Sequence, residues 1–277
     1  MTENLPSRIV CLTEETTETL YLLGEERRVV GISGYTVRPP RARREKPRVA
    51  AFLQARTDRI LALKPDLVIG FSDLQADIAR DLIRCGLNVL VFNQRSVAGI
   101  LGMVRTLAAL VGARARGEAL AAELAAGLEE IRGRAARFVT RPRVYFEEWD
   151  EPMICGIGWV SELIQLAGGE DVFAERARAP QAQGRIIENP AQVVAARPDI
   201  ILASWCGKKF RPERMRARPG WEEIPAVRDG LLFEIKSAEI LAPGPAALTD
   251  GVRHMHAIFA DWVAARARAS APGAGGA

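Results

Sequence analysis

The sequence predicts an α/β protein with two similar parallel-sheet lobes, one long rigid α-helix that joins them and a ligand cleft between the lobes. The helix is predicted at residues 113–138, which contain no proline and are rich in alanine, arginine and glutamate. Leu120, Leu124, Leu128 and Ile131 recur there at helical spacing and form one apolar stripe. On either side of this segment short strands and helices alternate, which is typical of parallel sheets.

A repeated pattern indicates that the two lobes are alike. Residues 58–69 and 191–202 each contain a short apolar helix, a basic residue (Lys64 or Arg197), a Pro-Asp pair and an apolar run. The proline ends the helix, and the apolar run suits a parallel strand that is covered on both faces. The expected parts are an N-terminal lobe at 1–112, the connecting helix at 113–138, a C-terminal lobe at 139–266 and a disordered tail at 267–277.

In the first lobe we expect strands where apolar and β-branched residues run together, and helices where a capping residue precedes an apolar period. The expected strands are 8–12, 29–33, 67–69 and 89–92. The expected helices are 14–23, which Gly24 ends, 58–63, 78–85, which Gly86 ends, and a helix that Ser96 caps and that runs to Val111. Residues 38–48 are too rich in proline and charge to be regular.

The same reasoning gives the elements of the second lobe. The expected strands are 143–147, 200–202 and 231–235, and the first is followed by a loop at 148–152. The expected helices are 159–167, which Gly168 and Gly169 end, 191–196, a helix that includes 221–224, and 248–265.

Composition excludes several classes of protein. The chain has 277 residues and a net charge of +4, which is too mild to imply nucleic-acid binding. No apolar stretch is long enough to span a membrane, and no signal peptide precedes the first strand, so we expect a cytoplasmic protein, or a periplasmic one if an export signal was removed. The cysteines Cys11, Cys85, Cys155 and Cys206 lie far apart and are expected to be buried thiols.

Histidine placement and the absence of nucleotide motifs argue against common enzyme classes. His254 and His256 are the only histidines, and their spacing of two points them to different faces of a helix. A shared metal site or a catalytic triad is therefore hard to build, and neither phosphate-loop nor dinucleotide motifs occur. We expect no metal and no covalent cofactor.

The order of motifs resembles that of the periplasmic-binding-protein family for vitamin B12 and iron–siderophore complexes. The resemblance rests on residues 12–18, on 29–40 with Tyr35 and Pro39-Pro40, on the two Pro-Asp repeats, and on 159–169 with its final Gly168-Gly169. It covers nearly the whole chain and is closest to the cobalamin-binding branch. The resemblance implies two lobes, a long connecting helix and a ligand in the cleft between them.

The resemblance also implies a docking pattern, from which this chain departs. Family members that feed a membrane permease usually carry a glutamate at the start of each repeat helix. Those positions here hold Asp58 and Ala191, and Glu188 lies close to the second. Asp58 and Glu188 are the candidate docking residues for an ABC permease.

Loops at the carboxyl ends of parallel strands present the candidate ligand-binding residues. Aromatic rings suit a broad flat ligand such as a corrin, because they lose little side-chain entropy on binding. The candidate contacts are Tyr35, Phe52, Phe71, Glu148, Trp149, Trp205, Cys206, Lys208, Phe210 and Trp221. The alternative for the aromatic residues is core packing.

Charged groups follow the same loops. The basic groups are Arg38, Arg41, Arg43 and Arg44 in the first lobe, and Lys208, Lys209, Arg211 and Arg214 in the second. If they face the cleft they favour an anionic ligand, and otherwise they belong to solvated loops. The acidic residues Glu147, Glu148, Asp150 and Glu151 could reach ligand amides or a cation, or lie at a solvated strand end.

We therefore expect a non-enzymatic, monomeric substrate-binding protein that holds a cobalamin or another corrinoid. A ferric siderophore or haem in the same cleft is the alternative ligand. A rival of another class is an enzyme that handles tetrapyrroles or metals through Cys206 and the acidic residues around Glu148.

Overall fold

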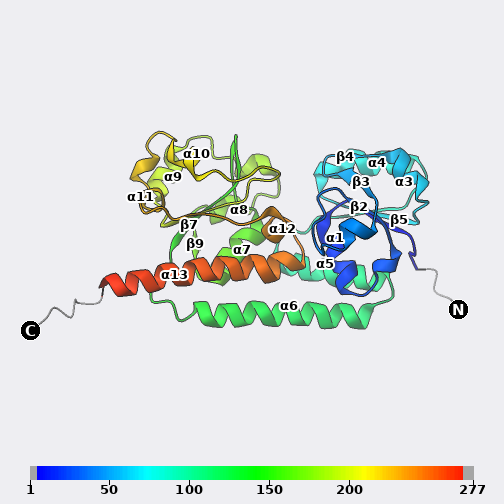
Figure 1. Cartoon of the computed structure of the whole chain (residues 1–277), viewed down its shortest axis with the longest axis horizontal. Coiled ribbons are helices and arrows are strands. Elements are labelled where there is room, and N and C mark those ends of the chain that lie inside the picture. Colours follow the sequence, from blue (N-terminus) through cyan, green and yellow to red (C-terminus); the bar gives the residue numbers. More distant parts are fainter. Residues whose placement is uncertain (1–4, 271–277) are drawn as a thin grey trace, which may run out of the picture. The chain divides into compact units, whose positions relative to one another are not determined.

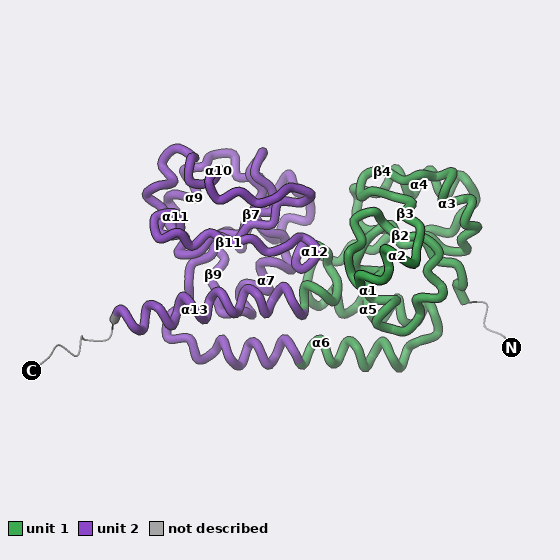
Figure 2. Tube along the Cα trace, in the orientation of Figure 1, with its two compact units in different colours: residues 1–126, 242–248 green, residues 127–241, 249–277 purple. Residues whose placement is uncertain are grey.

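The computed structural model describes residues 5–270 and contains two compact units (Figure 2). The first unit comprises the chain up to residue 126 together with residues 242–248, and the second comprises the remaining described residues. The division falls inside the long helix α6 (Arg114–Ala135), whereas the expected ranges treat that helix as a separate connector. Residues 267–270 continue the helix α13 (Val252–Ser270), and the rest of the predicted tail lies outside the described residues.

The first unit is built on a six-stranded sheet with the order β4-β3-β2-β1-β5-β6. Its strands are β1 (Ile9–Cys11), β2 (Val29–Ser33), β3 (Arg48–Ala51), β4 (Gln54–Ala55), β5 (Leu67–Phe71) and β6 (Val89–Phe92). Its helices are α1 (Glu14–Leu22), α2 (Ala42–Glu45), α3 (Thr57–Ala62), α4 (Ala76–Arg84) and α5 (Val97–Leu110), with short 3-10 turns η1 (Glu26–Arg28) and η2 (Asp73–Gln75) (Figure 1). The side chain of Ser96 caps α5 by accepting a hydrogen bond from the Gly99 amide, as predicted.

The second unit is built on a five-stranded sheet with the order β11-β10-β7-β8, in which β9 also pairs with β7. Its strands are β7 (Arg143–Asp150), β8 (Met153–Cys155), β9 (Glu170–Asp171), β10 (Ile200–Ala203) and β11 (Leu232–Glu234). Its other helical segments are α7 (Gly158–Ala167), α8 (Ala174–Ala177), η3 (Ala182–Arg185), α9 (Ala191–Ala196), α10 (Pro212–Arg216), η4 (Trp221–Glu223), α11 (Pro225–Arg228) and α12 (Ser237–Ile240); a π-helical turn at Ala247–Gly251 precedes α13.

The sheets are mixed rather than wholly parallel. The pairs β3–β4 and β7–β8 are antiparallel, and all the other strand pairs within the described sheets are parallel. Both antiparallel pairs are joined by two residues, Phe52-Leu53 and Glu151-Pro152. A two-residue turn can only return the chain antiparallel, since parallel strands need a long crossover. The α/β prediction with two similar lobes is confirmed, with this refinement.

The Pro-Asp repeat forms the same contacts in both units. In the first, the guanidinium of Arg8 donates to the carbonyl of Leu63 at the end of α3, and the Arg8 amide donates to the Asp66 carboxylate at 3.0 Å. In the second, Arg143 donates to the carbonyl of Ala196 at 3.2 and 3.0 Å, and its amide donates to Asp199 at 2.9 Å.

The backbone geometry of the repeat also matches. The residues before the two prolines, Lys64 and Arg197, share the left-handed conformation, with φ of 47° and 45°. Arg8 and Arg143 each stand one residue before the position at which their strand first pairs with the strand that follows the Pro-Asp turn. The arginine satisfies helix carbonyls that would otherwise lack a partner, so one side chain ties the helix end to the sheet.

Each sheet is the centre of its unit's apolar core. Val10, Leu12 and Val68 are buried in the first unit, and Ile201, Met215 and Trp221 in the second. Helix α6 buries Leu124, Leu128 and Ile131, the predicted stripe. In the proline-rich segment that was predicted to be irregular, residues 42–45 form the single-turn helix α2, because Ala42 is buried there and anchors the turn.

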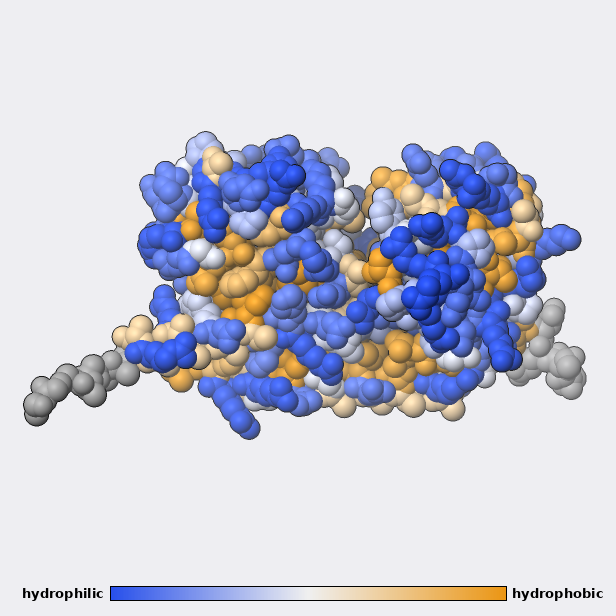
Figure 3. Space-filling view, viewed as in Figure 1, coloured by the Kyte–Doolittle hydropathy of each residue, from blue (hydrophilic) through white to orange (hydrophobic). Residues whose placement is uncertain are grey.

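The surface is mixed. On the face shown in Figure 3, hydrophilic side chains cover most of both units, with apolar patches between them. Within residues 5–270, no helix is both long and apolar enough to cross a bilayer.

Candidate functional site

The carboxyl edge of the second sheet gathers the acidic residues of β7. Strand β7 lies between β10 and β8, and Glu147 is in register with Ala203 at the end of β10. The strand continues through Glu148 and Trp149 to Asp150 before the chain turns into β8. Because β10 runs parallel to β7, the loop that begins at Ser204 leaves the sheet at the same edge. We call Glu147–Asp150, with the side chains that contact them, the carboxyl-edge cluster.

Glu147 is fully buried and has three partners. Its carboxylate accepts hydrogen bonds from both terminal nitrogens of Arg218, at 2.6 and 3.0 Å. It also accepts from the Trp205 indole at 2.9 Å and the Tyr145 hydroxyl at 3.0 Å. Burial raises the pKa of the Glu147 carboxyl, and the donors, led by Arg218, oppose that rise. This acid is therefore committed to holding the loop and is not available to a ligand.

Glu148 is held by another arginine, Arg185, which is buried. The terminal nitrogens of Arg185 donate to both oxygens of Glu148 and to the carbonyl of Cys155 at 2.6 Å. The Arg185 side chain is 3% exposed and that of Glu148 is 22% exposed. The pair fixes the direction of Glu148 while leaving part of its carboxylate open to solvent.

The open part of the cluster is formed by Trp149 and Lys208, which lie beside the buried Asp150. The ammonium of Lys208 donates to Asp150 at 2.7 Å and lies 3.9 Å from the centre of the Trp149 ring. Arg214 contacts the other Asp150 oxygen at 3.0 Å. Burial raises the pKa of the Asp150 carboxyl, but Lys208 and Arg214 outweigh it and hold that pKa below its usual range. The half-buried indole of Trp149 donates to the Glu151 carbonyl at 2.7 Å, which fixes the ring plane.

Three of the predicted aromatic contacts lie in the core of the second unit. Trp205 is 2% exposed and packs edge-on against Phe210 at 5.2 Å, while Trp221 is fully buried and packs against Tyr145. The rings of Trp205, Phe210 and Trp221 pack against other side chains, as expected for core residues. Contact of these three residues with a ligand stays a prediction. Cys206 and Lys209, in the loop after Trp205, are exposed.

The predicted aromatic contacts of the first unit differ in exposure. Tyr35 is 53% exposed, Phe52 is half-buried, and Phe71 is 7% exposed with the guanidinium of Arg95 over its ring at 4.8 Å. Gln75 joins the last two segments: its amide donates to the Phe52 carbonyl at 2.9 Å and accepts from the Phe71 amide at 2.9 Å. Tyr35 and Phe52 thus retain surface for a ligand.

The first unit carries its acids at the start of α1, directly after β1. Glu18 accepts from Arg38 at 2.8 Å and from the Ala246 amide at 3.1 Å, while Glu15 accepts from the Thr13 hydroxyl. Burial, followed by repulsion from Glu15, raises the pKa of Glu14 to about 8. Burial raises the pKa of Glu15 to about 7.

The remaining predicted residues lie on the surface or are held by local contacts. Asp58 on α3 and Glu188 before α9 are both exposed, so the two candidate docking residues are accessible. Arg41 contacts Glu26 and covers the Tyr21 ring at 4.8 Å, so it belongs to a local surface network. The histidines contact different groups, as predicted: His254 faces Glu239, and His256 lies 2.9 Å from the Ala167 carbonyl.

The cysteine prediction holds for two of the four residues. Cys11 and Cys155 are buried, and burial raises the pKa of each thiol to about 12. Cys85 and Cys206 are exposed, because Cys85 ends α4 and Cys206 lies in the loop after β10. The expectation of four buried thiols is therefore wrong for these two.

Comparison with known proteins assigns the family. A family profile described as "Periplasmic binding protein" matches residues 9–239. The vitamin B12-binding protein of Vibrio parahaemolyticus is 28% identical over 247 residues, which cover 87% of this chain and 85% of that protein. An uncharacterized ABC transporter substrate-binding lipoprotein of Bacillus subtilis, YvrC, is 24% identical over 90% of this chain and 79% of its own length.

Solved structures give the same fold. The periplasmic heme-binding protein RhuT of Roseiflexus sp. RS-1 is 25% identical, with a TM-score of 0.76 over 91% of this chain and 99% of that one. The periplasmic vitamin B12 binding protein BtuF of Vibrio cholerae is 23% identical, with a TM-score of 0.72 over 92% and 97%. The profile match spans most of the chain, and the chain therefore belongs to the periplasmic binding protein family.

Proposed function

We propose that this substrate-binding protein of the ABC transporter type binds a cobalamin or another corrinoid, and that Trp149 of the carboxyl-edge cluster contacts the ligand. A relative that spans 87% of the chain is a vitamin B12-binding protein. The observation that carries the ligand class is the pairing of Lys208 and Arg214 with Asp150. Arg214 also contacts Glu151 at 3.1 Å, so two carboxylates balance these two cations, and the surface beside Trp149 is not built mainly for an anion.

A flat ligand with amide groups suits this surface. The Trp149 ring is fixed on one side by its hydrogen bond to Glu151 and by Lys208 over its face, so little side-chain freedom is lost on binding. The partly exposed Glu148 carboxylate can accept from amide N–H groups, and the exposed Lys208 ammonium can donate to amide oxygens. A corrin offers both kinds of partner around a broad apolar ring.

A ferric siderophore or haem is the second candidate. Lys209 and Arg211 are exposed, and in residues 5–270 neither forms an ion pair with a carboxylate, so both could meet an anionic ligand. A solved structure at 25% identity is a periplasmic heme-binding protein. If the ligand contacts the paired cations Lys208 and Arg214, a corrinoid is favoured. If it contacts the unpaired cations Lys209 and Arg211, a ferric siderophore or haem is favoured.

The test is a titration of the purified protein with cyanocobalamin, haemin and a ferric hydroxamate, followed by calorimetry and absorbance. We expect the corrinoid to bind most tightly and Trp149→Ala to weaken it about 30-fold, a loss of about 2 kcal/mol. The matched control is Trp262→Ala, a half-buried tryptophan of the same unit under the guanidinium of Arg266, which should leave affinity unchanged. Tighter binding of haemin or the hydroxamate would overturn the corrinoid assignment.

We propose further that the protein is not an enzyme. Cys206→Ala should leave corrinoid binding intact, and incubation with the protein should return the corrinoid chemically unchanged by mass spectrometry. Conversion of the ligand by the native protein, lost in Cys206→Ala, would favour the enzyme alternative.

A further inference from the structure

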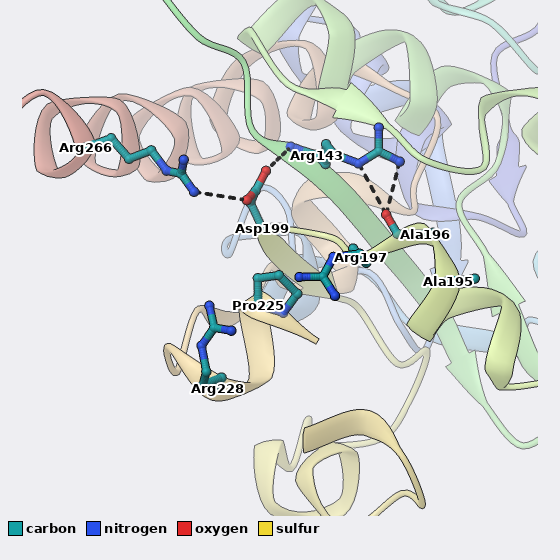
Figure 4. A pocket seen from close by; sticks show the side chains of 8 residues that line it. All are labelled: Arg143, Ala195, Ala196, Arg197, Asp199, Pro225, Arg228 and Arg266. Carbon is teal, nitrogen blue, oxygen red and sulfur yellow. Dashed lines mark hydrogen bonds and ion pairs between the residues drawn. The ribbon is translucent and has the colours of Figure 1, made fainter. Parts of the chain in front are cut away.

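A basic pocket lies at the amino edge of the second sheet, the edge opposite the carboxyl-edge cluster. It has a volume of about 390 Å³, which is within the range of small-molecule sites. It is lined by Arg143 at the start of β7, Arg197 after α9, Arg228 in α11 and Arg266 in α13, together with Ala195, Ala196, Asp199 and Pro225 (Figure 4). Four guanidiniums and one carboxylate thus face one space.

Two of these arginines are occupied with structural contacts. Arg143 donates to the Ala196 carbonyl and contacts Glu170 at 2.9 Å. Arg266 lies 3.7 Å from Asp199, the carboxylate of the pocket, and covers the Trp262 ring. Asp199 also accepts from the backbone amide of Arg143, whose guanidinium is turned to Ala196 and Glu170.

The other two arginines are open toward the pocket. Arg197 is exposed, and the described part of the chain places no carboxylate within ion-pair distance of it. Arg228 lines the pocket beside Pro225, and among the described residues it pairs with its neighbour Asp229. Guanidinium groups do not lose their protons in proteins, so the charge of Arg197, which has no carboxylate partner among those residues, is left for an anion to balance.

We propose that this pocket binds a small molecule of the phosphate class, through Arg197 and Arg228. The arginines come from four separate elements and approach from different directions, as Figure 4 shows. A tetrahedral phosphate offers oxygens in several directions, whereas a carboxylate offers two in one plane, so the arrangement favours phosphate. The volume leaves room for two linked phosphates or for one phosphate on a small organic group.

The experiment measures pyrophosphate binding by calorimetry at low ionic strength, without corrinoid. We expect saturable binding that Arg197→Gln and Arg228→Gln each weaken about tenfold. The matched control is Arg178→Gln, an exposed arginine of the same unit that pairs with Glu175 and does not line the pocket, which should change nothing. Corrinoid affinity should be the same in all three variants, which separates this proposal from the proposed function.

Two results would overturn the proposal. Absence of saturable pyrophosphate binding, or an equal loss in Arg178→Gln and the pocket variants, would show that the arginines act only as general surface charge. Tighter binding of citrate than of pyrophosphate would refute the phosphate class. Both pocket side chains are exposed and glutamine keeps their length, so we expect the variants to fold, which circular dichroism checks.

Discussion

At the amino edges of the two sheets, Arg8 and Arg143 form the same contacts with a helix end and an aspartate. At the carboxyl edges, the two units differ in how their acidic residues are paired. The second unit places an arginine or a lysine against each β7 acid: Arg218 on Glu147, Arg185 on Glu148 and Lys208 on Asp150. The first unit pairs Glu18 with Arg38 but, among the described side chains, holds Glu15 only through the hydroxyl of Thr13.

The difference shows which edge tolerates change. The amino-edge contacts connect a helix end to a strand start, so both copies need them for stability. The carboxyl edge is where α/β folds present their ligand groups, and there each unit carries its own set of charges. Three predictions test whether the two units differ in how their buried or edge charges are balanced.

The largest effect is expected from removing the cation that compensates Glu147. Arg218→Met leaves a fully buried carboxylate without its cation, and we expect the free energy of unfolding to fall by about 3 kcal/mol, measured by urea denaturation. The double variant Glu147→Gln with Arg218→Met removes the buried charge as well and should recover part of the loss. If the double variant is as unstable as Arg218→Met alone, the arginine stabilises by packing and not by its charge.

A smaller effect is expected from neutralising Glu15 in the first unit. Its pKa is about 7 in the folded protein and about 4 in an unfolded chain, so the folded state binds a proton more tightly in that interval. The stabilisation is therefore full below about pH 4 and is lost as the pH rises through 7. Glu15→Gln cannot ionise and should raise the free energy of unfolding by about 2 kcal/mol at pH 8, with a much smaller gain at pH 5.

The control for that prediction is Glu175→Gln, an exposed acid of the second unit. It should leave the pH dependence unchanged. Hydrogen exchange of the α1 amides locates the effect in the first unit. Equal gains from Glu15→Gln at pH 5 and pH 8 would show that Glu15 is already ionised in the folded protein at pH 5, so that burial does not raise its pKa to about 7.

Sequence reasoning succeeded where the signal is local. The Pro-Asp pairs correctly predicted both helix–strand turns, because proline restricts the backbone conformation of the residue before it and the apolar run that follows is typical of a strand. Ser96 was predicted as a cap because serine is a preferred residue directly before a helix, where its side chain can reach an amide three residues on. Residues 148–152 were expected to form a loop, but β7 continues through Trp149 to Asp150, so that expectation is wrong for 148–150.

The contacts that form the site could not be found in this way. Arg185 and Arg218 lie 37 and 71 residues from the acids they hold, and nothing in their neighbourhoods marks them as buried. Trp205 and Trp221 were chosen as ligand contacts by residue type, but residue type does not tell which side of a loop faces the core. Arg8 and Arg143, which contact the two Pro-Asp turns, were not predicted, because they lie 55 and 53 residues from those turns in the sequence.

The smallest effect is expected from neutralising the aspartate of the amino-edge contact in each unit, Asp66 or Asp199. Asp66 accepts from the Ser7 amide and hydroxyl at 2.7 and 2.8 Å and from the Arg8 amide, while Asp199 accepts from the Arg143 amide and lies 3.7 Å from Arg266. Asp66→Asn should therefore lower the free energy of unfolding by about 1 kcal/mol and Asp199→Asn by about half as much, because both sites are partly solvated.

A second measurement on the same two variants separates stability from charge. Asp199 is the only carboxylate among the residues that line the basic pocket, so Asp199→Asn removes the negative charge inside it, while Glu170 and Asp229, which contact Arg143 and Arg228, lie outside the lining. Pyrophosphate should then bind more tightly to Asp199→Asn, by a few-fold, and with unchanged affinity to Asp66→Asn. Tighter binding to both variants would mean that the anion responds to net charge alone, and the two amino edges would then be alike in charge as well as in contacts.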